Sequence, residues 1–263
     1  MRGTFMTRRW TAVAAALAVS AWLSTLDPVV MPLAAPTADP AGLVAVPAGR
    51  PVVAAPPRKI DCRRVKCVAL TFDDGPTAPT SKLLTILAQR KVRATFFLVG
   101  RNVAKRPQVV RSELAGGHEL ANHSYTHTDL ARASAARVRS ELGRTQSAIK
   151  RATGVTPRLM RPPYGSTDRT VASVTRKMRL AQILWAVDPN DWRDRNRRTV
   201  ERRVVAATRP GYIVLMHDIH PTTVAAVPNI IKRLAAKGYV FVTVSELFGK
   251  PLTPGKKYAK RRS

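Results

Sequence analysis

The chain has 263 residues, of which 45% are hydrophobic, enough to bury one large core, and we expect a single folded domain. Its 45 Lys and Arg outnumber 16 Asp and Glu and give a formal charge of +29, which favours contact with a polyanion: nucleic acid, an anionic membrane surface or an acidic cell-wall polymer. The two cysteines alone are too few for a structural zinc site.

Residues 1–25 have the pattern of a secretory signal peptide. Several arginines among the first nine residues precede an apolar run over residues 10–23, and Val19-Ser20-Ala21 offers a small-residue cleavage site. The run is shorter than the roughly 20 residues that span a bilayer, so we expect no stable transmembrane span, with an uncleaved anchor as the alternative. This predicts a secreted or envelope-associated protein and argues against a specific nucleic-acid partner.

Two further segments flank the predicted domain. Residues 26–60 are rich in Pro and Ala with few charges, which is typical of a semi-extended linker. Residues 251–263 form a basic tail, either disordered in solvent or in contact with a polyanion. In an exported protein, Cys62 and Cys67 would form a local disulfide, with two unpaired thiols as the alternative.

Residues 61–250 alternate short β-branched runs with amphipathic stretches, which predicts repeated strand–helix units. We predict seven strands, at 68–72, 94–99, 118–121, 158–160, 181–187, 212–216 and 240–244. We predict helices at 81–89, 107–115, 134–153, 168–178, 199–206 and 223–237. Such α/β units favour a parallel (β/α)7 barrel, with an open doubly wound sheet as the alternative. In both folds, active groups gather at the carboxyl ends of the strands.

Two adjacent carboxylates end the first predicted strand. Asp73 and Asp74 follow the apolar run 68–70, and Gly75-Pro76 ends the strand, so that both side chains can converge on one site. One carboxylate could then bind a metal while the other handles a proton. An acidic turn is the alternative interpretation of this motif taken alone.

His123 and His127 follow the third predicted strand and are four positions apart. With Asp74 they make a set of two histidines and one carboxylate, which leaves a metal coordination position open for water. The histidine spacing alone is a weak signal. It becomes a strong one when joined to Asp73-Asp74 at one strand end and to His217 at another.

Three more loops carry candidate groups. His217 ends the apolar run 212–216 and could donate a proton to a leaving group. The loop Arg161-Pro162-Pro163-Tyr164-Gly165 could aim a backbone amide at an oxyanion and hold an arginine beside a carboxylate. The loop 188–192 adds two acids and Trp192. Taken singly, the proline-rich and acidic loops are more often structural.

These motifs, in this order, resemble the polysaccharide deacetylase family, the NodB-homology domain of carbohydrate esterase family 4, which includes the chitooligosaccharide deacetylases. They are TFDDG at 71–75, HSYTH at 123–127, RPPYG at 161–165, DPNDW at 188–192 and LMH at 215–217. The resemblance covers residues from about 66 to 248, within the catalytic domain that we predict at 61–250. It implies a distorted seven-stranded barrel.

The resemblance also implies roles for the motif residues. Asp74, His123 and His127 would bind a divalent metal, usually Zn²⁺, with Co²⁺ or Ni²⁺ as substitutes. Asp73 would be the base towards metal-activated water, and His217 would protonate the departing sugar amine. Arg161 would pair with Asp73, and Asp191 would support the protonated state of His217. The Tyr164 backbone N–H would donate to the oxyanion. Trp192 and Leu215 would surround the acetyl methyl group.

The function expected on this basis is a secreted N-deacetylase of N-acetylated polysaccharides, foremost peptidoglycan, because a basic surface suits anionic polymers of the cell envelope. Chitooligosaccharides and acetylxylan are the alternative substrates. A non-catalytic wall-binding protein on the same scaffold is the alternative from another class, and the complete motif set argues against it.

Overall fold

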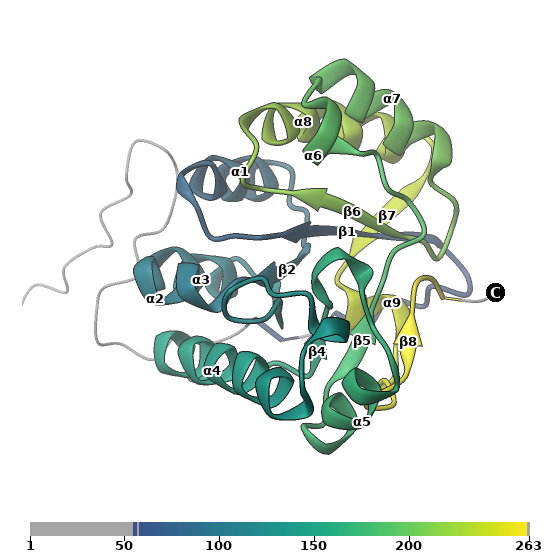
Figure 1. The fold of residues 1–263 in the computed structure, drawn as a ribbon. Helices are drawn as coiled ribbons and strands as arrows, with labels where there is room; N and C mark the ends of the chain where they lie inside the picture. Colours follow the sequence, from purple (N-terminus) through teal and green to yellow (C-terminus); the bar gives the residue numbers. More distant parts are fainter. Residues whose placement is uncertain (1–54, 57, 262–263) are drawn as a thin grey trace, which may run out of the picture. The chain divides into compact units, whose positions relative to one another are not determined.

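The computed structural model describes residues 55–56 and 58–261 (Figure 1). The predicted signal peptide and most of the predicted linker lie outside these residues, as do the last two residues of the basic tail. Within the described part of the chain, no helix is long and apolar enough to cross a membrane.

The described strands form one curled, parallel sheet in the order β6-β1-β2-β3-β4-β5-β8, with β7 paired to β1. They are β1 (Lys66–Asp73), β2 (Thr95–Leu98), β3 (Glu119–Asn122), β4 (Leu159–Met160), β5 (Ala181–Ile183), β6 (Ile213–His217), β7 (Tyr239–Val242) and β8 (Lys257–Tyr258). A bridge between Val187 and Val214 brings the segment after β5 back to β6. The predicted distorted (β/α)7 barrel is confirmed, and all seven predicted strands are present.

The last two strands depart from a regular barrel. Ala69 of β1 pairs with Ile213 on one edge and with Val242 on the other, so β7 occupies the edge that β2 uses further along β1. β8 was not predicted. It pairs with β5, which makes the basic tail an extension of the sheet rather than a disordered segment as far as Tyr258. A two-residue Lys-Tyr strand carries no periodicity from which it could be predicted.

Helices flank the sheet on its outer side (Figure 1). They are α1 (Ala78–Gln89), α2 (Gly100–Lys105), α3 (Pro107–Ala115), α4 (Ala135–Thr153), α5 (Arg169–Lys177), α6 (Asp191–Asp194), α7 (Arg197–Ala207), α8 (Pro221–Ala236) and α9 (Val244–Phe248). The six predicted helices are confirmed to within three residues. Their starts are set locally: the side chains of Ser134, Asp168 and Asn196 accept hydrogen bonds from first-turn N–H groups of α4, α5 and α7.

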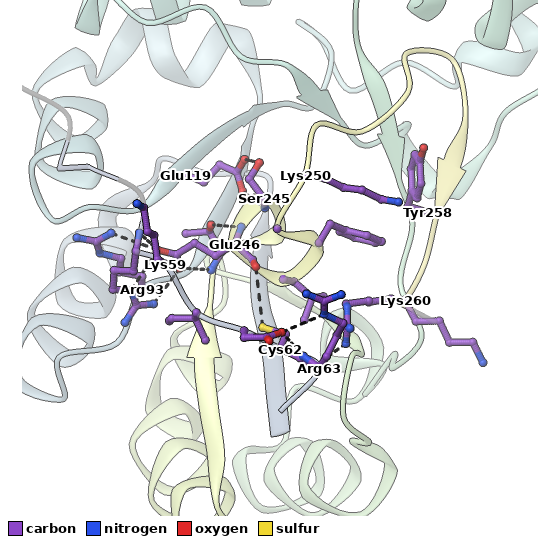
Figure 2. Close-up of a pocket in the computed structure, with 18 of the residues that line it drawn as sticks. Lys59, Cys62, Arg63, Arg93, Glu119, Ser245, Glu246, Lys250, Tyr258 and Lys260 are labelled. Carbon is purple, nitrogen blue, oxygen red and sulfur yellow. Dashed lines mark hydrogen bonds and ion pairs between the residues drawn. The ribbon is translucent and has the colours of Figure 1, made fainter. Parts of the chain in front are cut away.

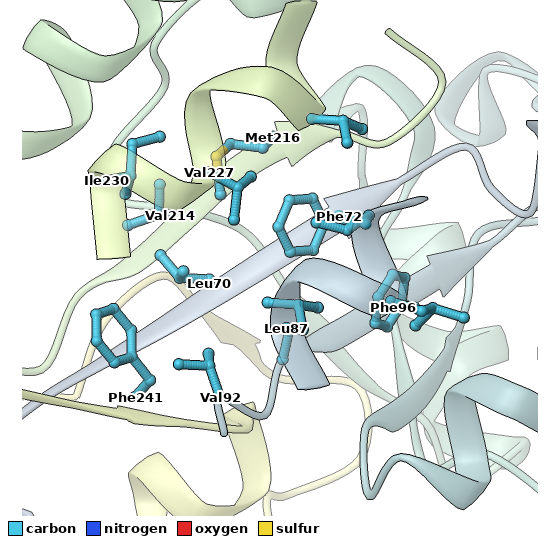
Figure 3. Close-up of a cluster of buried hydrophobic side chains, with 14 of the residues drawn as sticks. Leu70, Phe72, Leu87, Val92, Phe96, Val214, Met216, Val227, Ile230 and Phe241 are labelled. Carbon is cyan, nitrogen blue, oxygen red and sulfur yellow. The ribbon is translucent and has the colours of Figure 1, made fainter. Parts of the chain in front are cut away.

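The alternation of side chains along β1 separates two cores. Leu70 and Phe72 point outward and pack with α1 and α8, in the cluster shown in Figure 3. Ala69 belongs to the second cluster, inside the barrel, together with Phe97 of β2. Because side chains alternate with a period of two, Thr71 and Asp73 share the inner face with Ala69. The strand that supplies the outer core therefore delivers Asp73 to the end of the barrel interior.

Two features secure the chain where it approaches β1. Cys62 and Cys67 form the predicted disulfide. Close by, the buried Glu246 of α9 accepts hydrogen bonds from the Arg58 guanidinium at 2.9 Å and 3.1 Å and from the Thr243 N–H at 3.0 Å. Burial alone would raise the pKa of Glu246, but these hydrogen bonds and the charge of Arg58 outweigh burial and lower the pKa to about 2.

Because its pKa is lower in the folded state, Glu246 should stabilise the fold above pH 4.5 and lose that contribution as the pH falls towards 2. Glu246→Gln should therefore reduce the free energy of unfolding at pH 7 by roughly 2 kcal/mol, with the deficit shrinking between pH 4.5 and pH 2. Urea unfolding at stepped pH measures this. Glu201→Gln, whose partner Arg233 is half exposed, is the matched control and should cost under about 1 kcal/mol. A Glu246→Gln deficit that is unchanged at pH 2 would contradict the assignment.

Candidate metal centre and active site

The predicted site residues meet at the carboxyl ends of the strands. Asp73 ends β1 and lies in register with His217 at the end of β6. His123 follows directly after β3, and its N–H donates to the Leu98 carbonyl at the end of β2. Parallel pairing aligns these ends at one edge of the sheet, so groups far apart in the sequence face one another.

Asp74, His123 and His127 form a compact donor set, as predicted. The Asp74 Oδ1 atom lies 3.5 Å from His123 Nε2 and 3.2 Å from His127 Nε2. One donor atom from each residue lies within 4.8 Å of the other two. Asp74 Oδ1 is buried, yet it accepts no hydrogen bond from the described residues.

The protonation states of this set suit a cation. Burial lowers the pKa of His123 to about 3, so this imidazole is neutral near pH 7 and does not form an ion pair with Asp74. His123 Nδ1 lies 2.7 Å from the Arg161 carbonyl oxygen, which can only accept, so Nδ1 carries the proton and Nε2 keeps its lone pair. A buried carboxylate oxygen that faces two imidazole nitrogens and has no hydrogen-bond partner among the described residues fits a divalent metal of the zinc type.

The backbone around the donors is held in an uncommon conformation. Asp74 (φ 75°), Ser124 (φ 59°), His127 (φ 62°) and Tyr164 (φ 62°) all lie in the left-handed region. Non-glycine residues rarely adopt this region, because it costs conformational free energy. It persists only where surrounding contacts enforce it. One such contact is the hydrogen bond from Asn102 Nδ2 to the Asp74 carbonyl at 2.8 Å.

Asp73 is fixed by a completely buried arginine. Arg161 donates to Asp73 Oδ1 at 2.6 Å and to Thr71 Oγ1 at 2.9 Å. The guanidinium lies 4.0 Å from the Phe97 ring centre and 5.6 Å from that of Trp185. Burial raises the pKa of Asp73 above its ordinary value, and the charge of Arg161 opposes that rise. The second carboxylate oxygen remains directed at the metal set, 3.6 Å from His123 Nε2.

His217 is paired with the buried Asp191, as predicted. Its Nδ1 lies 2.8 Å from Asp191 Oδ1, and its backbone N–H donates to Oδ2 at 2.8 Å. Thr223 donates to the same Oδ2. Burial alone would lower the pKa of His217, but the hydrogen bond and charge of Asp191, with further charge from Asp73 and Asp74, raise it to about 9. The imidazole is therefore a cation near neutral pH.

The remaining predicted residues lie at the margin of this edge. Tyr164 is 70% exposed, and its phenol oxygen lies 3.2 Å from His127 Nδ1. Its backbone N–H donates to no backbone carbonyl in the described part of the chain. Trp192 is half exposed beside Asp191, and the buried Leu215 precedes His217 on the same face of β6. The roles predicted for these three residues stay predictions.

Several contributing residues escaped the sequence interpretation. Thr71 lies within a quoted motif, where its hydroxyl could have been recognised as a partner of Arg161. Thr223, on α8, reaches Asp191 only after folding. Asn102 and Trp185 lie outside all five motifs, and only the fold brings them to the site.

Comparison with known proteins agrees with the fold. The family model for polysaccharide deacetylase matches residues 61–183. The chain is 42% identical to the peptidoglycan-N-acetylglucosamine deacetylase PgdA of Listeria monocytogenes over 73% of this chain and 41% of that protein. It is 43% identical to a chitooligosaccharide deacetylase of Bradyrhizobium over 61% of this chain and 74% of that protein.

Among solved structures, a family 4 acetyl xylan esterase from Clostridium thermocellum, in complex with a cobalt ion, superposes with a TM-score of 0.70 at 34% identity. The match covers 74% of this chain and 98% of that one. The chain belongs to the polysaccharide deacetylase family. It spans about two fifths of the length of the Listeria relative.

The pKa of His217 should depend on the charge of Asp191. In metal-free protein, Asp191→Asn should lower the His217 pKa well below about 9, because burial would then be opposed only by the charges of Asp73 and Asp74. Titration of the imidazole by NMR measures this. Thr223→Val removes one hydrogen bond to Asp191 but no charge, so it should lower the His217 pKa less. Equal shifts in the two variants would contradict the charge pairing.

Proposed function

We propose that this protein is a secreted, metal-dependent polysaccharide N-deacetylase that removes acetyl groups from N-acetylated sugars of peptidoglycan. The observation that carries the proposal is the Asp74 Oδ1 atom, which faces the Nε2 atoms of His123 and His127 and accepts no hydrogen bond from any residue that the structure describes. Beside it, Asp73 is held by Arg161. The cationic His217 stands at the neighbouring strand end, where a proton donor is needed.

Asp74, His123 and His127 would hold the metal, for which we propose Zn²⁺, with Co²⁺ or Ni²⁺ as substitutes. The cobalt ion in the Clostridium relative supports a divalent cation. When bound, such an ion supplies Lewis-acid polarisation of a carbonyl and lowers the pKa of water towards about 7. The Arg161 carbonyl orients the His123 ring for this purpose by accepting the Nδ1 proton.

The protein's own groups divide the remaining work of amide hydrolysis. Asp73 takes a proton from the attacking water, and Arg161 holds its carboxylate with the second oxygen directed at the metal set. The Tyr164 N–H would donate to the carbonyl oxygen as negative charge develops there. His217 gives its proton to the sugar nitrogen as the carbon–nitrogen bond breaks. The products are acetate and a free amino sugar, and no redox partner is required.

Peptidoglycan is favoured as the substrate by the Listeria relative and by the pattern of an exported, basic chain. Trp192 and Leu215 would receive the acetyl methyl group. Chitooligosaccharides and acetylxylan are the alternatives, supported by the Bradyrhizobium and Clostridium relatives. A non-catalytic wall-binding protein is disfavoured because a retired site would be expected to lose the base, the acid or a donor, and this chain keeps all of them.

The proposal is tested by acetate release from purified peptidoglycan, chitin oligomers and acetylxylan, before and after chelation and metal restoration. We expect metal-dependent release from peptidoglycan. Asp73→Asn should lower turnover by roughly 10²- to 10⁴-fold while one divalent ion stays bound, because only the base is lost. His127→Ala should lose metal and activity together. Equal metal loss in both variants would contradict this division of roles, and release only from another substrate would reassign the substrate.

The Tyr164 phenol should tune metal affinity through His127. Tyr164→Phe removes the hydrogen-bond partner of His127 Nδ1 but keeps the backbone N–H, so metal dissociation should become about tenfold easier, with kcat at saturating metal changed little. Competition with a chromogenic chelator measures the affinity. Tyr125→Phe, in the loop that carries His123 and His127 but with its ring against Arg144, is the matched control and should bind metal like the wild type. Unchanged affinity in Tyr164→Phe would show that the phenol does not position His127.

A further inference from the structure

A large groove opens at the amino ends of β1, β2 and β3 and extends past α9 to β8 and to Leu184, just after β5 (Figure 2). It is lined by the approach to β1, by residues at the starts of β2 and β3, by α9 and by the segment 256–261, and it encloses about 1700 Å³. The catalytic groups lie at the opposite ends of the same strands. The eight residues of β1 separate the two ends by roughly 23 Å at about 3.3 Å per residue.

The groove is strongly basic. Nine Lys or Arg line it, against three Asp or Glu, and each of these carboxylates already has partners. Glu246 is bound by Arg58 and Arg93, Glu119 accepts from Thr95 and Ser245, and Asp61 accepts from Arg63. Five lysines are exposed and form no ion pair with any described residue: Lys59, Lys250, Lys256, Lys257 and Lys260. Their mutual repulsion favours an anionic occupant.

The shape of the groove narrows the choice of occupant. It is concave, so a flat bilayer surface could reach only its rim, whereas a polymer chain can lie along it. Single-stranded nucleic acid binds by stacking bases on open aromatic faces. Here Tyr258 and Phe248 pack edge to face, with ring centres 5.3 Å apart, and the Tyr258 hydroxyl accepts from the Thr253 N–H. Each ring is only partly exposed, which suits contact with the apolar parts of a polyol or sugar unit.

We propose that this groove binds a linear polyol-phosphate polymer of the cell envelope, whose repeating phosphates pair with Lys250, just after α9, and with the lysines of the basic tail. The ordering of β8 against β5 contributes to the site, because it fixes Lys256 and Lys257 at the groove wall. The proposal shares the envelope location of the proposed function but none of its chemistry. Binding at the amino ends would leave the catalytic edge free and raise the effective concentration of enzyme at the wall.

The test compares two fourfold Lys/Arg→Gln variants of the full chain. The groove variant changes Lys250, Lys256, Lys257 and Lys260. The control variant changes Lys105, Arg139, Lys150 and Arg151, which are exposed, lie outside the groove and form no ion pair within the described residues. The probe is fluorescently labelled poly(glycerol phosphate), titrated at several NaCl concentrations, with dT20 and anionic phosphatidylglycerol vesicles as competing polyanions.

The groove variant should bind poly(glycerol phosphate) at least about tenfold more weakly at 0.1 M salt, and the dependence of its log affinity on log salt should become shallower by about 3. The control variant should stay within about twofold of the wild type. An equal loss of affinity in both variants would mean that binding depends on charge spread over the whole surface, not on the groove, and would overturn the proposal. Tighter, lysine-dependent binding of dT20 or of vesicles would assign the groove to nucleic acid or membrane instead.

Acetate release from a short neutral chitin oligomer is measured on the same proteins. The rate of acetate release should be the same in the wild type, the groove variant and the control variant, which would show that the candidate active site is intact. If none of them releases acetate from this oligomer, from purified peptidoglycan or from acetylxylan, the deacetylase proposal fails while the binding comparison still decides the groove.

Discussion

The buried ion pair between Arg161 and Asp73 is the interaction on which the rest of the site depends. The guanidinium is wholly inaccessible to solvent and donates to Asp73, to Thr71 and to the carbonyls of Ile183 and Leu184. It thereby joins β1 to the segment around the end of β5, across the barrel interior. A buried charge is tolerated only with such complete pairing, and removing one partner of a buried pair typically costs about 3–5 kcal/mol.

The same residue also sets the chemistry of the donor set. While its side chain orients Asp73, its backbone carbonyl accepts the Nδ1 proton of His123 and leaves Nε2 free for the proposed metal. The two histidines then differ because of their surroundings. Burial without a strong anionic hydrogen-bond partner keeps His123 neutral, whereas the buried Asp191 keeps His217 charged. Opposite pKa shifts in one site leave one imidazole neutral and the other cationic, which suits the proposed roles of ligand and acid.

The sequence predicts those parts of the structure that repeat or cluster. Leu70 and Phe72 face outward and Asp73 faces inward, and this alternation shows where β1 ends. The motifs identify the donor set before any fold is known. What escapes prediction depends on contacts distant in the sequence. Lys257 and Tyr258 become a strand only because β5 offers a free edge, and Asn102 reaches Asp74 only because α2 follows β2 closely. The partners of Glu246 lie 188 and 153 positions away, at Arg58 and Arg93.

The two ends of the barrel are electrostatically independent, and this permits a highly charged protein to keep finely set pKa values at its candidate active site. Mobile ions screen exposed charges over about 8–10 Å in physiological salt, well under the roughly 23 Å that β1 places between its ends. The exposed lysines of the groove therefore act on whatever approaches them, not on His217. The His217 pKa is set by neighbours in direct contact, Asp191 first among them. Evolution could accumulate positive charge at the amino ends without altering the acid at the carboxyl ends, because burial and distance separate the two tasks.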